Sequence, residues 1–262
     1  MGKYATWLAC GAVAAALVLV GVGLDRVLGS GFALSLAGLA LAAFYLSGTF
    51  GATTPFFGRV ASTSSEPGHF ALTFDDGPDP RHTPAIGRLL AVRSHRATFF
   101  VLGVHARKYP EILVQLAADG HELASHGEDH RLLAFAPPST VRRQLAATEA
   151  AVRAATGRAP APLFRAPHGV RSPWLSRTAA RCGYRVCAWH GSVFDTAQPG
   201  VTRVVERTCR LLRPGSIVLL HDGDASGRLG SRRQTLAALP AILDEAERCG
   251  LRSVPLSSLL RP

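Results

Sequence analysis

The stretch "ALTFDDGPDP", Ala71 to Pro80, runs from an apolar segment of strand length straight into two adjacent carboxylates, Asp75 and Asp76. Neighbouring carboxylates repel each other, and burying either of them is costly unless a cation or a proton compensates the charge. A turn that keeps both side chains solvated is the simpler interpretation of such a string. The rest of the sequence must therefore supply a partner for these charges before the stretch indicates a functional site.

From His69 onward, apolar runs of strand length alternate with segments of helical periodicity. The seven apolar runs are HFALTF, ATFFVLG, HELAS, PLFRA, YRVCAWH, SIVLLH and LRSVP. Helix-start signals, a Thr or Ser followed by Pro, occur at Thr83-Pro84 and Ser172-Pro173. Seven strand-and-helix units in about 190 residues predict a parallel α/β domain, either an open doubly wound sheet or a closed barrel.

Polar side chains follow five of these runs, at the point where each predicted strand ends. They are Asp75 and Asp76 after the first run, His126 and His130 after the third, Arg165 at the end of the fourth, Asp195 beyond the fifth, and His221 at the end of the sixth. The carboxyl ends of parallel strands meet at one edge of a sheet or barrel, so we expect these side chains to converge on one site. Such convergence favours a functional site over a purely structural pattern.

The two histidines after the third run have a spacing suited to metal binding. His126 and His130 are four residues apart, so both can lie on one side of a helical turn, although this spacing alone is weak evidence. An Asp from another strand end would complete a two-histidine, one-carboxylate site with positions left open for water and substrate. One carboxylate of the Asp-Asp pair would then bind the cation, and its neighbour would act as a base on the activated water.

The remaining strand-end residues suit the other steps of a hydrolysis. His221 is placed to protonate the leaving atom. Arg165 is placed to hold the base carboxylate, and Asp195 to orient His221 and keep it protonated. Together these residues predict the hydrolysis of an amide or an ester.

The strings TFDDGP, SHGEDH, FRAPHG, WHGSVFD and LLHDG resemble, in this order, the five motifs of the NodB-type polysaccharide deacetylases, carbohydrate esterase family four. The resemblance spans about Phe70 to Leu260, and five motifs in order are far more specific than any one of them. It implies a distorted (β/α) barrel of the NodB deacetylase type. It also implies a divalent metal, with Zn²⁺ expected and Co²⁺ or Ni²⁺ as alternatives, bound by Asp76, His126 and His130.

The resemblance also implies roles for individual residues. The catalytic set would be Asp75 as general base, His221 as general acid, Arg165 to position the base and Asp195 to tune the acid. The substrate-binding set would be Pro167, His168, Trp189 and Leu220. The backbone N–H near His168 would help to stabilise the oxyanion, and Trp189 and Leu220 would line the pocket for the acyl group.

The chain departs from the family pattern at five positions. Gly127 stands where a Ser or Thr usually follows the first metal histidine, so a supporting hydrogen bond in that loop is expected to be weaker. Ala166 and His168 replace the first Pro and the Tyr of an R-P-P-Y string. Thr196 stands where a Trp is common, and His190 where a small polar or acidic residue is frequent. No predicted ligand, base or acid is lost, so these departures concern the substrate rather than the reaction. Five further histidines are expected at the surface or at strand edges: His69, His82, His95, His105 and His121.

The N-terminal part predicts a membrane anchor. Ala5–Leu24 is a run of 20 residues without charge, long enough to cross a bilayer core of about 30 Å, and Val27–Gly58 again contains no charged residue. We expect a multi-pass anchor in residues 1–60, with transmembrane helices at about 5–24 and 30–50, ahead of a catalytic domain in residues 61–262. A cleaved signal peptide is an alternative, but its apolar region would be only about 7–15 residues long. A buried helical hairpin is another.

The globular part is basic. After Arg59 it holds 26 Lys and Arg against 17 Asp and Glu, a surplus of nine. This balance favours anionic partners such as lipid headgroups, phosphorylated carriers or acidic glycans. The sequence lacks a dense Lys/Arg run and an aromatic-basic stripe, which argues against nucleic acid as a partner.

We therefore predict a membrane-anchored, metal-dependent hydrolase that acts on carbon–nitrogen bonds other than peptide bonds. It would remove the N-acetyl (or an O-acetyl) group from amino sugars of a cell-envelope glycan. Two alternatives stay open: a deformylase or deacetylase of a lipid-linked amino sugar, and a catalytically inactive glycan-binding protein. The side of the cell membrane stays undecided, because the positive-inside count favours a cytoplasmic domain and the resemblance favours an external one. The sequence determines neither the sugar, the metal nor the oligomeric state.

Overall fold

The structure, a computed structural model, describes residues 67–225 and 231–260 together with Arg26, Leu36, Gly38 and Ala40. Among these residues, no helix combines the length and the apolar character needed to cross a membrane. Apart from Leu36, Gly38 and Ala40, the two predicted spans at 5–24 and 30–50 lie outside the described residues. The membrane anchor and the boundary at residue 60 therefore stay predictions.

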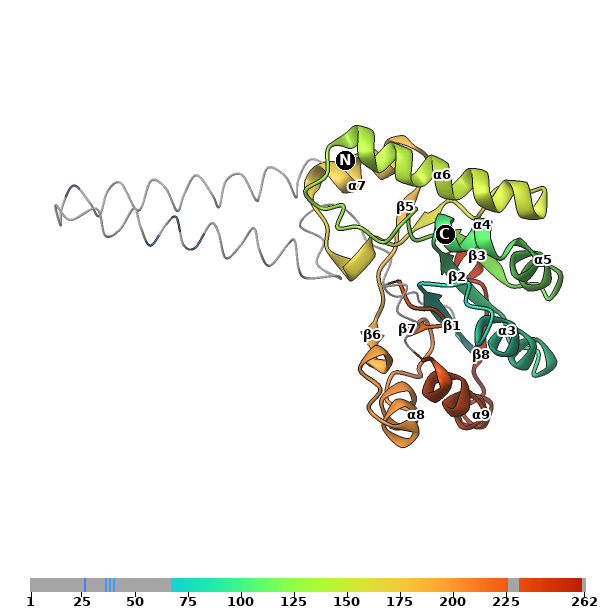
Figure 1. Ribbon diagram of the computed structural model, residues 1–262. Coiled ribbons are helices and arrows are strands. Elements are labelled where there is room, and N and C mark those ends of the chain that lie inside the picture. The colour runs from blue at the N-terminus through green and yellow to red at the C-terminus, as the bar shows by residue number, and fades with distance from the viewer. Residues whose placement is uncertain are drawn as a thin grey trace.

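Eight parallel strands form one curled sheet in the described part of the chain (Figure 1). They are β1 (His69–Asp75), β2 (Ala97–Val101), β3 (Glu122–Ser125), β4 (Leu163–Phe164), β5 (Arg185–Val186), β6 (Gly191–Ser192), β7 (Ile217–His221) and β8 (Arg252–Ser253). Their order is β5-β4-β3-β2-β1-β7-β6, and β8 pairs with the start of β1. The prediction of a parallel α/β fold is confirmed in the form of a curled half-barrel. Each of the seven predicted runs contains a strand, and β6 is an additional short one.

Most of the helices lie around the outside of the sheet (Figure 1), whereas the short α10 (Leu256–Leu259) packs against its inner face. The others are α3 (Thr83–Val92), α4 (Gly103–Lys108), α5 (Pro110–Ala118), α6 (Pro138–Thr156), α7 (Pro173–Arg181), α8 (Val201–Cys209) and α9 (Arg233–Arg248), with 3-10 turns η2 (Pro167–Gly169) and η3 (Asp195–Ala197). The predicted start of α7 is confirmed, because the Ser172 hydroxyl accepts a hydrogen bond from the N–H of Leu175. Such a cap satisfies a backbone donor that the first helical turn leaves unpaired.

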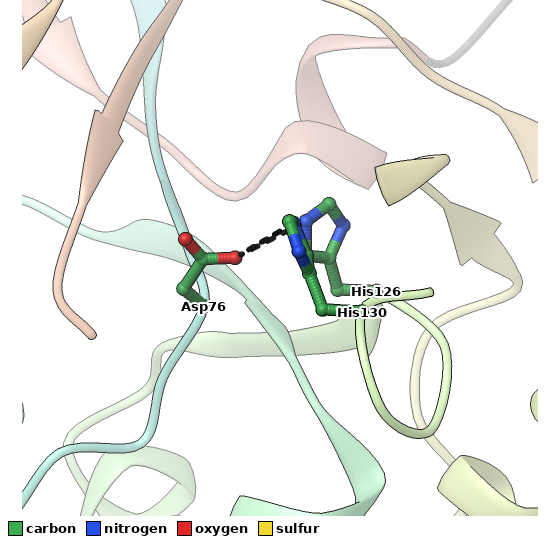
Figure 2. Close-up of side chains that lie close together, drawn as sticks. All are labelled: Asp76, His126 and His130. Carbon is green, nitrogen blue, oxygen red and sulfur yellow. Dashed lines mark ion pairs between the residues drawn. The ribbon is translucent and has the colours of Figure 1, made fainter. Parts of the chain in front are cut away.

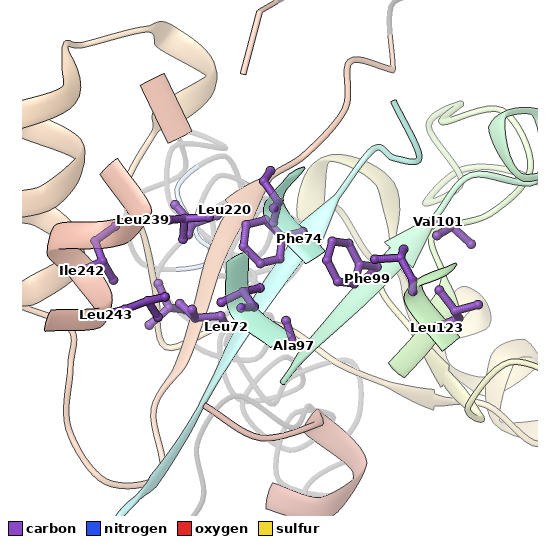
Figure 3. Close-up of a cluster of buried hydrophobic side chains, with 14 of the residues drawn as sticks. Leu72, Phe74, Ala97, Phe99, Val101, Leu123, Leu220, Leu239, Ile242 and Leu243 are labelled. Carbon is purple, nitrogen blue, oxygen red and sulfur yellow. The ribbon is translucent and has the colours of Figure 1, made fainter. Parts of the chain in front are cut away.

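Successive residues of each strand point to opposite faces of the sheet, and this alternation divides the core in two. The outward-facing side chains pack under the helices, and Figure 3 shows Leu72, Phe74 and Leu220 among them, next to Leu239 and other residues of α9. The inward-facing side chains form a second cluster. Its members include Ala71, Phe100, Ala124, Leu163 and Ile217, and Leu256 and Leu259 of α10. Apolar contacts thus fill the interior, and the polar residues collect at the carboxyl ends of the strands.

We predict that Phe99→Ala lowers the free energy of unfolding by about 3–5 kcal/mol, the usual cost of removing a buried aromatic side chain. Phe99 is fully buried, and its ring is stacked on Phe74 with the ring centroids 5.1 Å apart. Urea titration followed by circular dichroism measures the change. Val92→Ala is the control, because Val92 is 78% exposed. A loss of similar size in both variants would contradict the prediction.

Candidate active site

The strand-end residues meet at the carboxyl edge of the sheet, as the sequence predicts. β1 lies between β2 and β7, and Asp75 is directly opposite His221 in the register of β1 and β7. Arg165 follows β4, which is three strands away from β1 in the sheet, and its side chain reaches Asp75. Residues separated by up to 146 positions in the chain therefore share one site.

The two adjacent carboxylates point in different directions because their backbone conformations differ. Asp75 ends β1 in an extended conformation, whereas Asp76 has a φ of 74°, in the left-handed region that Asp adopts more readily than most residues. Gly223 lies so close to this turn that a Cβ would be 2.3 Å from the carbonyl oxygen of Asp76. The Nδ1 atom of His105 lies 2.9 Å from the same oxygen. The turn therefore directs the carboxylate of Asp75 towards Arg165 and the carboxylate of Asp76 towards His126 and His130.

Asp76, His126 and His130 form a group that fits a metal ion. Figure 2 shows the carboxylate facing both imidazole rings: Oδ1 of Asp76 lies 3.4 Å from Nε2 of His126 and 3.2 Å from Nε2 of His130. Ligand atoms held at 2.0–2.2 Å by a tetrahedral ion lie about 3.4 Å apart. Oδ1 of Asp76 is buried and has no hydrogen bond within the described residues. A cation is the partner that suits this oxygen.

The surroundings orient the two rings for metal binding. Nδ1 of His126 lies 2.8 Å from the carbonyl oxygen of Arg165, which turns Nε2 towards Asp76. Burial and the neighbouring His126 disfavour a charge on His130 and lower its pKa to about 4. Histidine binds a metal in its neutral form, so this environment favours the ligand state.

Asp75 is held by a buried guanidinium. Oδ1 of Asp75 accepts a hydrogen bond of 2.7 Å from Arg165, whose side chain is fully buried. The same nitrogen of Arg165 donates to the hydroxyl of Thr73, and the guanidinium lies 4.1 Å from the ring centroid of Phe100. The other oxygen of Asp75 is 3.8 Å from Nε2 of His126. A carboxylate in this position can reach a water next to the metal group.

His221 and Asp195 form a second charged pair. Oδ1 of Asp195 lies 2.8 Å from Nδ1 of His221, and Oδ2 accepts hydrogen bonds from the backbone N–H of His221 and the hydroxyl of Thr235. Burial disfavours the charged imidazole, but Asp195 outweighs it, so the pKa of His221 is raised. Burial also opposes ionisation of Asp195, but its hydrogen bonds outweigh this and its pKa is lowered. With Nδ1 committed to Asp195, Nε2 is the nitrogen available for proton transfer.

A cleft of about 500 Å³ opens beside the metal group. Its lining includes Asp76, His130, His168, Thr196, Gln198 and Arg232. His168 is exposed, and its ring lies against that of His130 with the centroids 4.4 Å apart. Pro167 is buried, and Trp189 is half-buried with its ring 5.6 Å from the Arg165 guanidinium. Of the predicted substrate-binding residues, His168 is thus the one that lines the cleft.

Leu220 requires a correction. It is fully buried in the core under α9, on the outer face of β7 (Figure 3). Because side chains alternate along a strand, Leu220 points away from the face that carries His221. Leu219 is the neighbour that belongs to the inner side, two residues before His221. The motif identified the correct strand, β7. The pleat of the strand makes Leu219, rather than Leu220, the residue that faces inward.

Other supporting residues escaped the sequence analysis. His82, His95 and His121, expected at the surface or at strand edges, are buried, and His105 contacts the Asp76 turn. Asp222 is also buried, where its carboxylate accepts a hydrogen bond from the hydroxyl of Thr83, and burial raises its pKa to about 7. The string LLHDG includes Asp222, but no local pattern predicts that Asp222 and the three histidines are buried.

Two charged pairs beside a group of side chains that fits a metal ion are an arrangement that suits hydrolysis. A family model described as polysaccharide deacetylase matches residues 63–187. A chitooligosaccharide deacetylase of Bradyrhizobium sp. (strain ANU 289) is 35% identical over 209 residues, covering 78% of this chain and 94% of the relative. A peptidoglycan-N-acetylglucosamine deacetylase of Bacillus cereus is 35% identical over 193 residues, covering 73% of this chain and 87% of the relative.

Solved structures agree. The peptidoglycan N-acetylglucosamine deacetylase Bc1960 superimposes with a TM-score of 0.71 at 28% identity, covering 76% of this chain and 91% of that chain. The chain therefore belongs to the polysaccharide deacetylase family, whose members are hydrolases of carbon–nitrogen bonds other than peptide bonds.

We predict that Asp195→Asn shifts the basic limb of the pH profile of kcat/KM to lower pH. A general acid acts in its protonated form, so activity is lost as the pH rises through the pKa of His221. Asp195 raises this pKa above its usual value of 6.5, and removing the carboxylate charge lowers it again. Asp244→Asn on the exposed side of α9 should leave the limb in place. If the basic limb stays at the same pH in Asp195→Asn, the limb does not report the protonation of His221.

Proposed function

We propose that the protein is a metal-dependent deacetylase that removes the N-acetyl group from N-acetylglucosamine residues of a glycan, either a chitooligosaccharide or peptidoglycan. The observation that carries the proposal is the convergence of Asp76, His126 and His130. Oδ1 of Asp76 lies 3.2–3.4 Å from the Nε2 atoms of the two histidines, and the group is next to a carboxylate and an imidazole that each have a charged partner. The relatives named for these two substrates support it.

The residues of the site divide the reaction between them. A divalent ion, for which zinc is our candidate, would be held by Asp76, His126 and His130, where it would activate water and polarise the acetyl carbonyl. Asp75 takes a proton from the attacking water. His221 gives a proton to the sugar nitrogen as the carbon–nitrogen bond breaks, which lets the amine leave. Acetate and the free amino sugar are the products.

The proposed substrate contacts follow from the cleft. The exposed ring of His168 offers a polar edge to a sugar at the mouth of the cleft, and its backbone N–H is the proposed oxyanion donor. Leu219, together with Trp189, is the proposed lining for the acetyl methyl group in place of Leu220. The turn Pro167–Gly169 would thus contact the sugar and supply the oxyanion donor. Both roles depend on its position shortly after β4 and Arg165.

We predict that the full-length protein releases acetate from chitooligosaccharides or peptidoglycan fragments, that chelation abolishes the release and that zinc restores it. Asp75→Asn should lower kcat by about 10²–10⁴-fold, the usual contribution of a general base, and retain bound zinc. Enzymatic assay of acetate and metal analysis of the purified protein give the two readouts. Activity that survives in a His126→Ala, His130→Ala double variant would refute the proposed mechanism.

A lipid-linked amino sugar is the second candidate substrate. The net charge of +11 and the predicted apolar spans favour an anionic, membrane-bound substrate, with formyl or acetyl as the acyl group. We propose a cell-membrane location on the strength of these spans and leave the face open. Release of formate or acetate from an undecaprenyl-phosphate-linked amino sugar, with no turnover of soluble glycans, would favour this candidate.

A catalytically inactive glycan-binding protein is the third candidate. The complete set of base, acid and metal-binding residues argues against it, because a site under no catalytic demand has no reason to retain both charged pairs. Glycan binding without turnover, in protein that carries stoichiometric zinc, would favour this candidate over the other two.

A further inference from the structure

The two metal-binding histidines are carried by a loop, residues 126–130, which we call the ligand loop. Its carbonyl groups are bound by the first turn of α4. The N–H of Gly103 donates to the carbonyl of Gly127 at 3.1 Å, and the N–H of Val104 donates to the carbonyl of Glu128 at 3.0 Å. The amide groups that start a helix have no partner within it, so they are free to hold an adjacent loop.

The N–H groups of the ligand loop are bound from the opposite direction by one side chain, Gln144 of α6. Its Oε1 accepts hydrogen bonds from the N–H of Glu128 at 2.7 Å and of Asp129 at 3.3 Å. Its Nε2 donates to Oδ1 of Asp129 at 2.9 Å. Gln144 is 6% exposed, so the two N–H groups donate to a buried amide oxygen. A buried N–H without a partner is costly, which makes this one amide important to the loop.

The ligand loop passes close to the Gln144 amide at Gly127. Gly127 has a φ of 83°, a conformation that suits glycine, and a Cβ added there would lie 3.3 Å from Oε1 of Gln144. α6 thus supplies hydrogen bonds to the loop in which Gly127 stands where a Ser or Thr is common. The donor–acceptor pattern also requires Oε1 rather than Nε2 to face the two N–H groups.

We propose that Gln144 is a positioning residue that presets the ligand loop, so that His126 and His130 face Asp76 before the metal arrives. The inference rests on the proposed function for the identity of the bound group, a divalent cation. A preformed loop avoids the cost of ordering the two histidines on binding, so Gln144 acts on metal affinity without touching the metal.

The test is Gln144→Met in the full-length protein, with two readouts that need no substrate. Met has a similar length, and its thioether sulfur is only a weak acceptor for the two N–H groups. Amide hydrogen exchange of the metal-free protein should be faster at Glu128 and Asp129. The dissociation constant for Zn²⁺, measured by competition with a chromophoric chelator, should rise about 10–100-fold, the usual effect of losing an outer-shell partner.

Two variants keep the test independent of simple destabilisation. Gln144→Glu retains an acceptor for the N–H of Glu128 but places a carboxylate oxygen against Oδ1 of Asp129, so protection should return at Glu128 and not at Asp129. Gln144→Asn keeps the amide but is one methylene too short, so it should reproduce the loss of protection and of zinc affinity. It serves if the Met variant fails to fold.

The matched control is Gln234→Met on α9. It removes a comparable hydrogen bond, from the N–H of Gly200 at 2.8 Å, and Gln234 is far from the ligand loop in the chain. It should leave the zinc affinity unchanged.

The outcomes separate this inference from the proposed function. Unchanged exchange and unchanged zinc affinity in Gln144→Met and Gln144→Asn would overturn it, and so would an equal loss of affinity in Gln234→Met. A wild-type protein that binds no zinc would refute the proposed function, and the exchange experiment would still decide whether Gln144 presets the loop.

Discussion

The buried ion pair between Arg165 and Asp75 is the interaction on which the rest of the site depends. A guanidinium with no exposed surface must have a charged partner and hydrogen bonds, because an unpaired buried charge is prohibitively costly. Arg165 meets this demand with Asp75 on β1, and its own carbonyl accepts from the ring of His126. One residue of the β4 end therefore positions both the proposed base and a metal ligand. The central place of β1 in the sheet makes this contact possible.

The same logic separates the roles of the proposed base and the proposed acid. Asp75 has a cationic partner, and His221 has an anionic one, so each group is surrounded by charges that suit its proposed task. Opposite environments for two groups at one site are how a fold assigns an acid and a base. Asp76, adjacent to Asp75 in sequence, is turned away from this pair by its left-handed backbone and faces the histidines instead.

Much of this site could be predicted from local patterns. Asp75, His126 and His221 lie directly at or after strand ends, and parallel strands bring such ends together whatever the details of packing. Supporting residues such as Gln144 and Thr235 could not be found in this way. They lie within helices, and their partners are 15 to 40 residues away, so only the packing of helix against loop reveals them. Leu220 shows a different limit, since the motif identifies the strand and the pleat decides which residue faces inward.

The sequence by itself determined the order of the strands and helices, the parallel α/β class and the identity of the charged residues that gather at one edge. These follow from periodicity and from side-chain chemistry, which are local properties. Only the tertiary structure decided which carboxylate faces which partner, which leucine turns inward, and which side chain holds the ligand loop. Those choices depend on distances between segments remote in the chain, where burial makes each unpaired donor or charge costly and leaves few arrangements that satisfy them all.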